Sequence, residues 1–253
     1  MLRSRIIPCL LVHNKGLVKT VKFKNPKYVG DPINAVKIFN EKEVDELIVL
    51  DIDATIEGRS PNFKMIKNLA DECRMPFCYG GGISTLNEAK KIISLGVEKV
   101  ALSNTALSNI DLCIEIGEVI GMQSIVVVID VKKRKLFGEY DIYTHNGTQK
   151  SKWSLNDFVN KLEEIKVGEI VINSIDNDGI MQGYDIKLVE LIRNMCSMPI
   201  TVLGGASSLF DIKKLISNFK VIGAAAGSLF VFKGKYKAVL INYPNREERN
   251  SYY

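Results

Sequence analysis

The chain repeats itself at a constant offset of 123 residues. Pro76 and Pro199 form one identical pair at this offset, and the strand-ending glycines that follow them form others. The remaining pairs are Val44 and Val167, Glu46 and Glu169, Asp53 and Asp176, Gly81 and Gly204, Gly82 and Gly205, Ser84 and Ser207, Lys90 and Lys213, and Lys91 and Lys214. One shared offset without a gap predicts a duplicated unit, with halves at about residues 1–122 and 123–253.

Short β-branched runs alternate with helical segments along the chain, which is the pattern of βα units in a parallel sheet. Between residues 86 and 95, Leu86, Ala89 and Ile92 share one helical face. Strands are expected at residues 5–12, 46–53, 76–82, 99–104, 125–132, 169–176, 199–205 and 221–228. The length of 253 residues suits one such domain. We predict a single (β/α)8 TIM barrel over residues 1–253, made of two duplicated half-barrels, with an open doubly wound sheet as the alternative.

The charge and the cysteines exclude several classes of protein. The 34 Lys and Arg residues against 29 Asp and Glu give a net charge of +5, spread along the chain rather than gathered as in a nucleic-acid binder. A small anionic substrate fits this excess better. Five cysteines without C-x-x-C spacing indicate a reduced, cytoplasmic protein with no disulfide frame.

Membrane insertion, metal binding and cofactor binding find no support in the sequence. The longest apolar run, near residues 221–232, is too short for a membrane span, and no signal peptide is visible. His13 and His145 lack ligand spacing, so no metal is assigned, and no cofactor is expected.

Glycines end two of the expected strands, one in each half. Each glycine pair precedes a helix, and the strand after it ends in small polar residues. Backbone N–H groups at such turns can approach an anion closely. Glycine also serves tight turns, but two equivalent sets favour two phosphate sites and a substrate with a phosphate at each end. The first set is Gly81, Gly82, Ser103 and Asn104, and the second is Gly204, Gly205, Gly227 and Ser228.

Carboxylates end three other strands, where a barrel of this kind places its active site. Asp130 closes the apolar run at residues 125–129, which is typical of a general acid or base, although it could also cap a turn. Asp51 and Asp53 share a strand face by alternation, and we expect one to reach substrate hydroxyls and the other to cap a loop. Asp51 and Asp176 are assigned to substrate binding.

Charged residues stand at the opposite ends of four strands. Arg5, Glu46, Lys99 and Glu169 lie at or near the strand starts and should form a ring at the bottom mouth of the barrel. An ordinary solvated ion-pair network is the alternative. Residues 133–152 follow the fifth strand and contain Asn146-Gly147, a hairpin signal. We interpret this segment as a flap beside the active rim, and a plain surface hairpin is equally compatible.

Together these features resemble the cyclase subunit of imidazole glycerol phosphate synthase. The resemblance implies a barrel that docks a glutaminase subunit on its N-terminal face, as a heterodimer, and passes ammonia to the active rim. It also implies that Arg5, Glu46, Lys99 and Glu169 gate this path, that Lys19 belongs to the substrate-facing first loop, and that Asp130 is one of two catalytic aspartates. The motifs are Arg5-Ile6-Ile7-Pro8-Cys9-Leu10, Gly30-Asp31-Pro32, Asp45-Glu46-Leu47, Gly80-Gly81-Gly82-Ile83, Val127-Val128-Ile129-Asp130, Ser174-Ile175-Asp176-Asn177-Asp178-Gly179 and Gly183-Tyr184-Asp185.

The second catalytic aspartate of the family is replaced here by Leu11. A leucine cannot transfer protons, and loss of a positioned acid or base lowers a rate by roughly 10²–10⁴-fold. With this departure the chain resembles a group of paralogues associated with the biosynthesis of bacterial surface polysaccharides, including lipopolysaccharide. The resemblance implies that ammonia is passed to a sugar amidotransferase. The C-terminus departs as well, since residues 235–244 read as extended where the family has an amphipathic helix.

Three functions follow from these observations. The preferred one is an ammonia-conducting subunit for sugar amidination, with a glutaminase and a third, sugar-modifying partner. The second is the histidine-pathway cyclase itself, a lyase acting on a bisphosphorylated ribulosyl carboxamide. The third is a subunit that binds a phosphorylated metabolite without catalysis.

Overall fold

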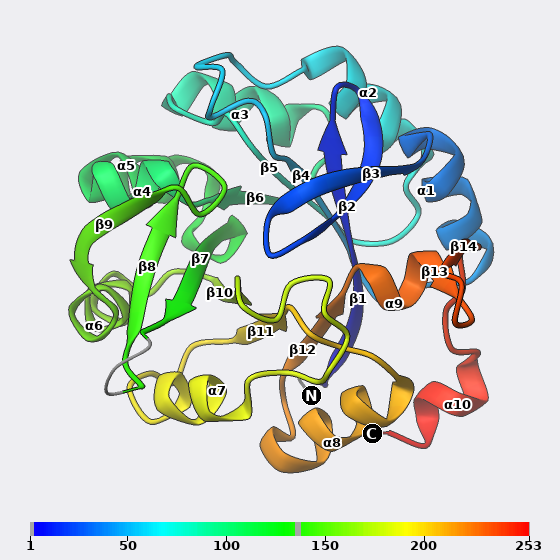
Figure 1. Cartoon of the computed structure of the whole chain (residues 1–253). Coiled ribbons are helices and arrows are strands. Elements are labelled where there is room, and N and C mark those ends of the chain that lie inside the picture. The colour runs from blue at the N-terminus through cyan, green and yellow to red at the C-terminus, as the bar shows by residue number, and fades with distance from the viewer. Residues whose placement is uncertain (1–2, 135–137, 253) are drawn as a thin grey trace.

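The computed structural model describes residues 3–134 and 138–252 (Figure 1). Within these residues eight parallel strands close on themselves, because β10 pairs with both β7 and β11 and leaves no edge. The fold is therefore a (β/α)8 TIM barrel as predicted, and the open doubly wound sheet is excluded. In barrel order the strands are β10 (Glu169–Ser174), β11 (Ile200–Leu203), β12 (Gly223–Ala226), β1 (Arg5–His13), β4 (Leu47–Asp51), β5 (Phe77–Gly80), β6 (Lys99–Leu102) and β7 (Ile125–Lys133).

Helices follow the barrel strands and lie around the outside of the sheet (Figure 1). Their starts are specified by local sequence: Thr85 and Glu88 form a capping box, and Ser208 and Asp211 form the equivalent box in the second half. The helices of the outer ring are α1 (Pro32–Glu41), α2 (Phe63–Glu72), α3 (Leu86–Ser94), α4 (Asn104–Ser108), α5 (Ile110–Ile120), α6 (Leu155–Ile165), α7 (Ile186–Arg193) and α8 (Leu209–Phe219), with a short 3-10 turn, Met122–Ser124, before β7.

The sequence repeat is also a structural repeat. Strands β5 and β11 correspond residue for residue at the offset of 123, and the capping boxes do so as well. Helices α2 and α7, and α3 and α8, begin at equivalent residues. Each half thus supplies four neighbouring strands of the barrel, β1, β4, β5 and β6 against β7, β10, β11 and β12.

Each half also carries an antiparallel hairpin above its first strand. In the second half, β8 (Tyr140–Thr144) and β9 (Gln149–Ser154) extend β7 and turn at Asn146-Gly147, as the sequence predicts. Residues 135–137 of this predicted flap lie outside the described residues. In the first half, β2 (Gly16–Val21) and β3 (Lys24–Gly30) extend β1. The sequence reading of this segment as a loop missed the hairpin.

Two apolar layers fill the molecule. The larger lies between the strands and the helices. The smaller lies in the barrel interior and consists of Ile7, Cys9, Ile48, Cys78, Ala101, Val126, Val128, Val171, Leu203 and Ala225. This apolar layer lies between the two mouths of the barrel.

After β12 the chain departs from the regular βα pattern. A single turn, α9 (Ser228–Val231), leads into the short pair β13 (Phe232–Lys233) and β14 (Ala238–Val239). Residues 234–237 form the turn between these two strands, and residues 240–245 lead without regular structure to α10 (Arg246–Asn250). The segment expected to be extended at residues 235–244 therefore begins with a turn, and its later part contains no helix. None of the helices formed by residues 3–134 and 138–252 has the length and apolar character needed to cross a bilayer.

We predict that Leu69→Ala lowers the free energy of unfolding by about 2–5 kcal/mol, because Leu69 of α2 is fully buried and its truncation leaves a cavity. Urea denaturation measures this loss. The matched control is Val119→Ala on α5, where the side chain is 49% exposed and the change should stay within about 0.5 kcal/mol. Similar losses at both positions would contradict this packing.

Candidate active site

A pocket with a cavity volume of about 150 Å³ opens at the C-terminal ends of the barrel strands. It brings together residues that are distant in sequence and that the strand ends were expected to supply. Of the candidate residues at this rim, the pocket is lined by Lys19, Asp51, Gly81, Gly82, Ser103, Asn104, Asp130, Gly204, Gly205, Gly227 and Ser228. Asp176 is the exception, because its carboxylate lies outside the lining and accepts a hydrogen bond from the backbone N–H of Lys133 at 2.9 Å.

The two glycine turns face each other across the barrel. The first ends β5 beside β6, and the second ends β11 beside β12, on the opposite side of the strand order. Gly81 and Gly205 have positive φ angles, +117° and +108°. A Cβ at Gly81 would collide with the carbonyl oxygen of Asp51, and one at Gly205 with that of Gly183. These turns leave the strands earlier than expected, so β5 and β11 end two residues short of the predicted ranges.

Asp130 is a half-buried carboxylate that lines the pocket. It ends the apolar run of β7 and accepts a hydrogen bond from Asn173 Nδ2 at 2.9 Å. Burial raises the pKa of Asp130 to about 7, with a smaller contribution from the nearby Asp178 carboxylate and an opposing one from Asn173. A carboxyl group that titrates near neutral pH can both donate and accept a proton, which is what a general acid or base requires.

Leu11 occupies the wall opposite Asp130. Strand β1 lies four strands away from β7 in the eight-strand order, which is the far side of the barrel. Leu11 lines the pocket and pairs with Leu50 of β4, another apolar side chain. Asp130 therefore faces two aliphatic side chains, Leu11 and Leu50, across the pocket.

The two hairpins cover the pocket mouth. Asp178 holds the first hairpin, because its carboxylate accepts hydrogen bonds from Thr20 Oγ1 at 2.7 Å and from the Phe23 N–H at 3.1 Å. Asn146 holds the second by donating to the Ile52 carbonyl at 3.0 Å. Thr144, His145 and Asn146 line the pocket, so the segment is a flap at the active rim.

Lys19 points into the pocket from the first hairpin. Its Nζ donates to the Cys9 carbonyl at 2.6 Å and lies against Gly227 of the second glycine set. Burial lowers the pKa of Lys19, while attraction to Cys9 and Asp178 opposes the shift. A cation at this position can neutralise a phosphate bound at Gly227 and Ser228.

Asp51 at the end of β4 and Asp53 just after it both accept hydrogen bonds from neighbouring residues of this chain. Asp51 lines the pocket, but its oxygens already accept hydrogen bonds from Arg59 at 2.9 and 3.0 Å and from the Asp53 and Ala54 N–H groups. Asp53 caps the β1–β2 turn through His13 Nδ1 at 2.6 Å and the Asn14 N–H at 2.8 Å. Arg59 therefore reaches the site indirectly, through Asp51.

Sequence reasoning did not assign a role to Asn173 or Asp178. Asn173 lies at the end of β10 beside Asp130, and its Oδ1 is buried without a hydrogen-bond partner among the described residues. Such an acceptor costs about 1–3 kcal/mol unless a donor reaches it, so it is suited to bind an N–H or O–H of a ligand. Its signal in the sequence is weak, since Asn173 sits inside an apolar strand. Asp178 was visible only as part of the motif at residues 174–179.

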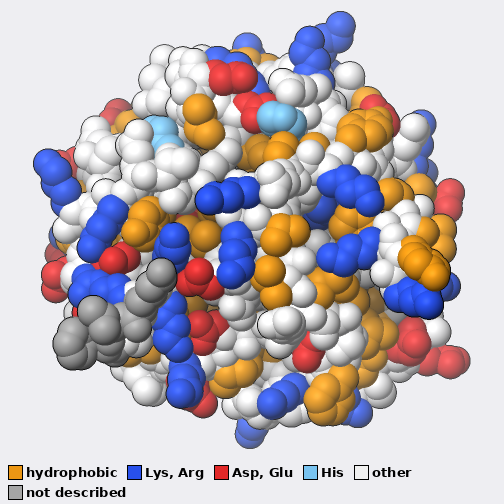
Figure 2. Space-filling view, in the orientation of Figure 1, with side chains coloured by type: hydrophobic (Ala, Val, Ile, Leu, Met, Phe, Trp, Pro, Cys, Tyr) orange, Lys and Arg blue, Asp and Glu red, His pale blue; other side chains and the backbone are white. Residues whose placement is uncertain are grey.

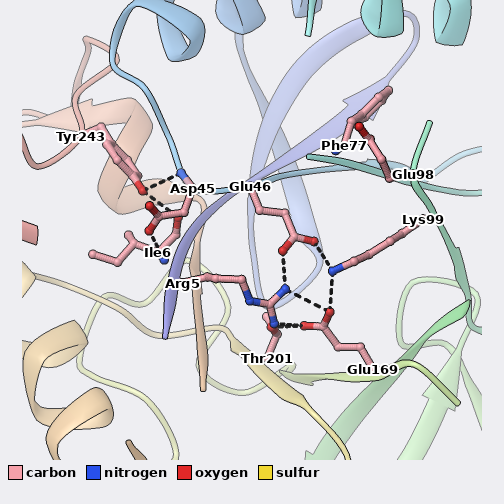
Figure 3. Close-up of polar contacts among 10 residues, drawn as sticks. All are labelled: Arg5, Ile6, Asp45, Glu46, Phe77, Glu98, Lys99, Glu169, Thr201 and Tyr243. Atoms are coloured by element: carbon pink, nitrogen blue, oxygen red, sulfur yellow. Dashed lines mark hydrogen bonds and ion pairs between the residues drawn. The ribbon is translucent and has the colours of Figure 1, made fainter. Parts of the chain in front are cut away.

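The ring at the bottom mouth is formed as predicted (Figure 3). Arg5 pairs with Glu46 and, at 2.8 Å, with Glu169, and Lys99 pairs with the same two carboxylates at 2.7 and 2.9 Å. Thr201 also donates to Glu169. The side chains of Glu46 and Glu169 are only 3% and 4% exposed. Burial alone would raise the pKa of Glu169, but Arg5 and Lys99 lower it to about 2.

No cluster of three or more His, Cys, Asp or Glu side chains suited to a metal ion occurs in residues 3–134 and 138–252. The five cysteines are free thiols, and four of them are buried.

The fold and the site define a (β/α)8 barrel whose rim carries two opposed glycine turns and Asp130, a carboxyl group whose pKa is raised to about 7. Residues 5–237 match the model of the histidine biosynthesis protein family, and the chain belongs to that family. A relative from Vibrio vulnificus, provisionally named imidazole glycerol phosphate synthase subunit hisF3, is 55% identical over 98% of this chain and 96% of its own.

Other relatives extend the comparison. One from Leptospira interrogans, provisionally named imidazole glycerol phosphate synthase subunit HisF, is 53% identical over 99% of both chains. One from Aliivibrio salmonicida, named imidazole glycerol phosphate synthase subunit HisF, is 36% identical over 91% of both chains. The similarity in each case covers nearly the whole barrel.

The raised pKa of Asp130 predicts a pH-dependent stability. A carboxyl whose pKa rises on folding, here from 3.8 to about 7, contributes stability below the lower value that is lost as the pH rises through the higher one. Relative to Asp130→Asn, the wild-type chain should therefore lose on the order of 3 kcal/mol between pH 4 and pH 8. Urea denaturation across this range measures the difference, and a pH-independent difference would contradict the shift.

Proposed function

We propose that this chain is the cyclase-type subunit of a glutamine-dependent amidotransferase complex, in which it receives ammonia from a glutaminase partner and delivers it for amidination of a surface-polysaccharide sugar. The observation that carries this proposal is the contrast between the two ends of the barrel. The charged ring at the bottom is complete, whereas the rim holds Asp130 opposite Leu11.

The ring is suited to control a small neutral molecule. Two buried carboxylates are neutralised by two cations that each bridge them, so the mouth is closed by ion pairs rather than by bulky side chains. Moving either cation opens a gap without unfolding a strand. Removing one partner from a buried pair is unfavourable by several kcal/mol, which keeps the resting ring closed.

The interior above the ring favours ammonia over ammonium. Between the ring and the rim pocket the side chains are apolar, and four of them are short: Cys9, Cys78, Ala101 and Ala225. A charged ammonium ion would lose its hydration there, whereas neutral ammonia would not carry that penalty. We propose that ammonia follows this route to the pocket.

The partner follows from the same reasoning and from the relatives. The relatives' names describe subunits of a synthase, which supports an assembly with another chain. We propose a heterodimer in which a glutaminase sits on the N-terminal face around Arg5, Glu46, Lys99 and Glu169. The two glycine turns would hold a substrate with two phosphate groups, and a sugar amidotransferase would be a third partner.

We expect Lys99→Met to uncouple ammonia transfer. In complex with the glutaminase, the variant should release about tenfold more of the ammonia from hydrolysed glutamine into solution, because Arg5 alone cannot complete the ring. Arg5→Met should behave similarly. The measurement is bulk ammonia relative to glutamate formed.

The control for these variants is Lys187→Met, which removes an exposed lysine from α7 on the outer surface. This variant should leave the ratio of bulk ammonia to glutamate unchanged. Unchanged ammonia transfer in both ring variants would rule out conduction through the ring.

The alternative function is the genuine cyclase of histidine biosynthesis. It is favoured by Asp130, whose pKa near 7 suits proton transfer, and by the two opposed glycine turns. On this alternative Leu11→Asp should raise cyclase turnover by roughly 10²-fold or more, and Asp130→Asn should abolish it. On the preferred function the wild-type chain has no cyclase turnover, so Asp130→Asn has none to abolish. Measurable wild-type turnover that Asp130→Asn removes would therefore favour the alternative.

A further inference from the structure

Tyr243, in the C-terminal segment, is hydrogen-bonded to the start of β1 and to the residues just before β4, next to Arg5 and Glu46 of the ring (Figure 3). Tyr243 Oη donates to the carbonyl of Ile6 at 2.8 Å and accepts from the N–H of Asp45 at 3.2 Å. The Asp45 carboxylate accepts from the Ile6 N–H at 2.9 Å. Ile6 directly follows Arg5, and Asp45 directly precedes Glu46. One phenol hydroxyl thus joins the starts of two ring-bearing strands.

Tyr243 is itself held firmly in place. Its ring packs against Phe230 with a centroid distance of 5.3 Å, and the Arg249 guanidinium lies 5.2 Å from the ring centroid. Arg249 is only 7% exposed and donates to the Glu43 carbonyl at 2.5 Å, two residues before Asp45. The contacts of Tyr243 and Arg249 therefore converge on one short stretch before β4.

This stretch borders a second cavity, of about 540 Å³, on the bottom side of the barrel. Arg249 and Asp45 line it together with Arg3, Arg74 and Arg246. A group that enters this cavity can contact Arg249 and Asp45, so the hydrogen-bonded stretch is accessible from the face on which the ring opens.

We propose that Tyr243 is a positioning residue for the ring, and that residues 243–250 act as a latch that holds the starts of β1 and β4 in register. The physical reason is that a buried carboxylate is stable only while a cation stays paired with it, and the attraction weakens as the two charges separate. If β1 and β4 separate, Arg5 moves away from Glu46, and water enters to solvate the carboxylate. The role of the ring as a gate rests on the proposed function, whereas the latch is a property of this chain alone.

Cysteines already present in the barrel can report on the latch. Cys78 is fully buried in the barrel interior, does not line the rim pocket, and lies within electrostatic reach of Glu46, Lys99 and Glu169. Cys9 lines the rim pocket and reports on the opposite mouth. Cys113 is fully buried on α5, outside the barrel interior. Cys78, Cys9 and Cys113 therefore distinguish three events: entry of a thiol reagent through the ring, entry through the rim, and global destabilisation of the fold.

We expect Tyr243→Phe to raise the rate at which methyl methanethiosulfonate modifies Cys78 by about tenfold, with the rates at Cys9 and Cys113 unchanged. The full chain, with no change other than the stated substitution, is treated with the reagent and digested. Mass spectrometry of the peptides then measures the extent of modification at each cysteine over time. Phenylalanine keeps the ring packing on Phe230 and removes only the hydroxyl.

The matched control is Tyr236→Phe, the same change in the same segment at a side chain that is 84% exposed, and all three rates should remain those of the wild type. Unchanged Cys78 reactivity in Tyr243→Phe would overturn the latch. An equal rise at Cys78 and Cys113 would also overturn it, because it would show general destabilisation. The two proposals can fail separately. If Tyr243→Phe raises the modification rate at Cys78 alone, but Lys99→Met and Arg5→Met leave ammonia transfer unchanged, the latch is supported and the proposed function is contradicted.

Discussion

Two strand ladders, β6 with β7 and β12 with β1, join the halves of the chain and close the barrel. The arrangement of both mouths depends on this closure. It sets Asp130 opposite Leu11 and the glycine turn of β5 opposite that of β11. It also brings four charged residues close enough to pair at the bottom mouth: Arg5 of β1, Glu46 just before β4, Lys99 of β6 and Glu169 of β10.

Figure 2 shows the molecule from the same side as Figure 1, with basic and apolar side chains intermixed on this face.

The two mouths of the barrel differ in their chemistry. At the bottom, two nearly buried carboxylates are tolerated only because two cations bridge them, so the ring is intact or it is destabilising. At the rim, Leu11 cannot transfer protons and pairs in register with Leu50 of β4, so the two side chains give this part of the pocket an apolar surface. The two mouths therefore differ in kind: Asp130 faces a leucine at the rim, whereas the bottom mouth holds a complete set of ion pairs.

The sequence predicted the barrel because its repeat and its β-branched runs are local signals, and it predicted the ring because strand starts share one mouth. It did not predict the first hairpin, since Lys22, Phe23 and Asn25 adopt left-handed backbone conformations there that leave no clear turn motif. The sequence also could not predict which of Asp176 and Asp178 lines the pocket. The two are separated by one residue in a turn after β10, and only the turn geometry decides that Asp178 lines the pocket while Asp176 binds the Lys133 N–H. Likewise, the hydrogen bonds that join Tyr243 to Ile6 and Asp45 span 237 and 198 residues of sequence, a separation at which sequence patterns give no signal.

The most direct test of the account is cyclase turnover of the bisphosphorylated ribulosyl carboxamide by the purified chain, with ammonia supplied directly at alkaline pH. Direct supply removes any need for a glutaminase, so the result concerns only the rim at which Asp130 faces Leu11. The account predicts no measurable imidazole glycerol phosphate from a folded chain that still activates a glutaminase. Robust product formation would contradict it and would show that another group at the rim replaces the missing carboxylate.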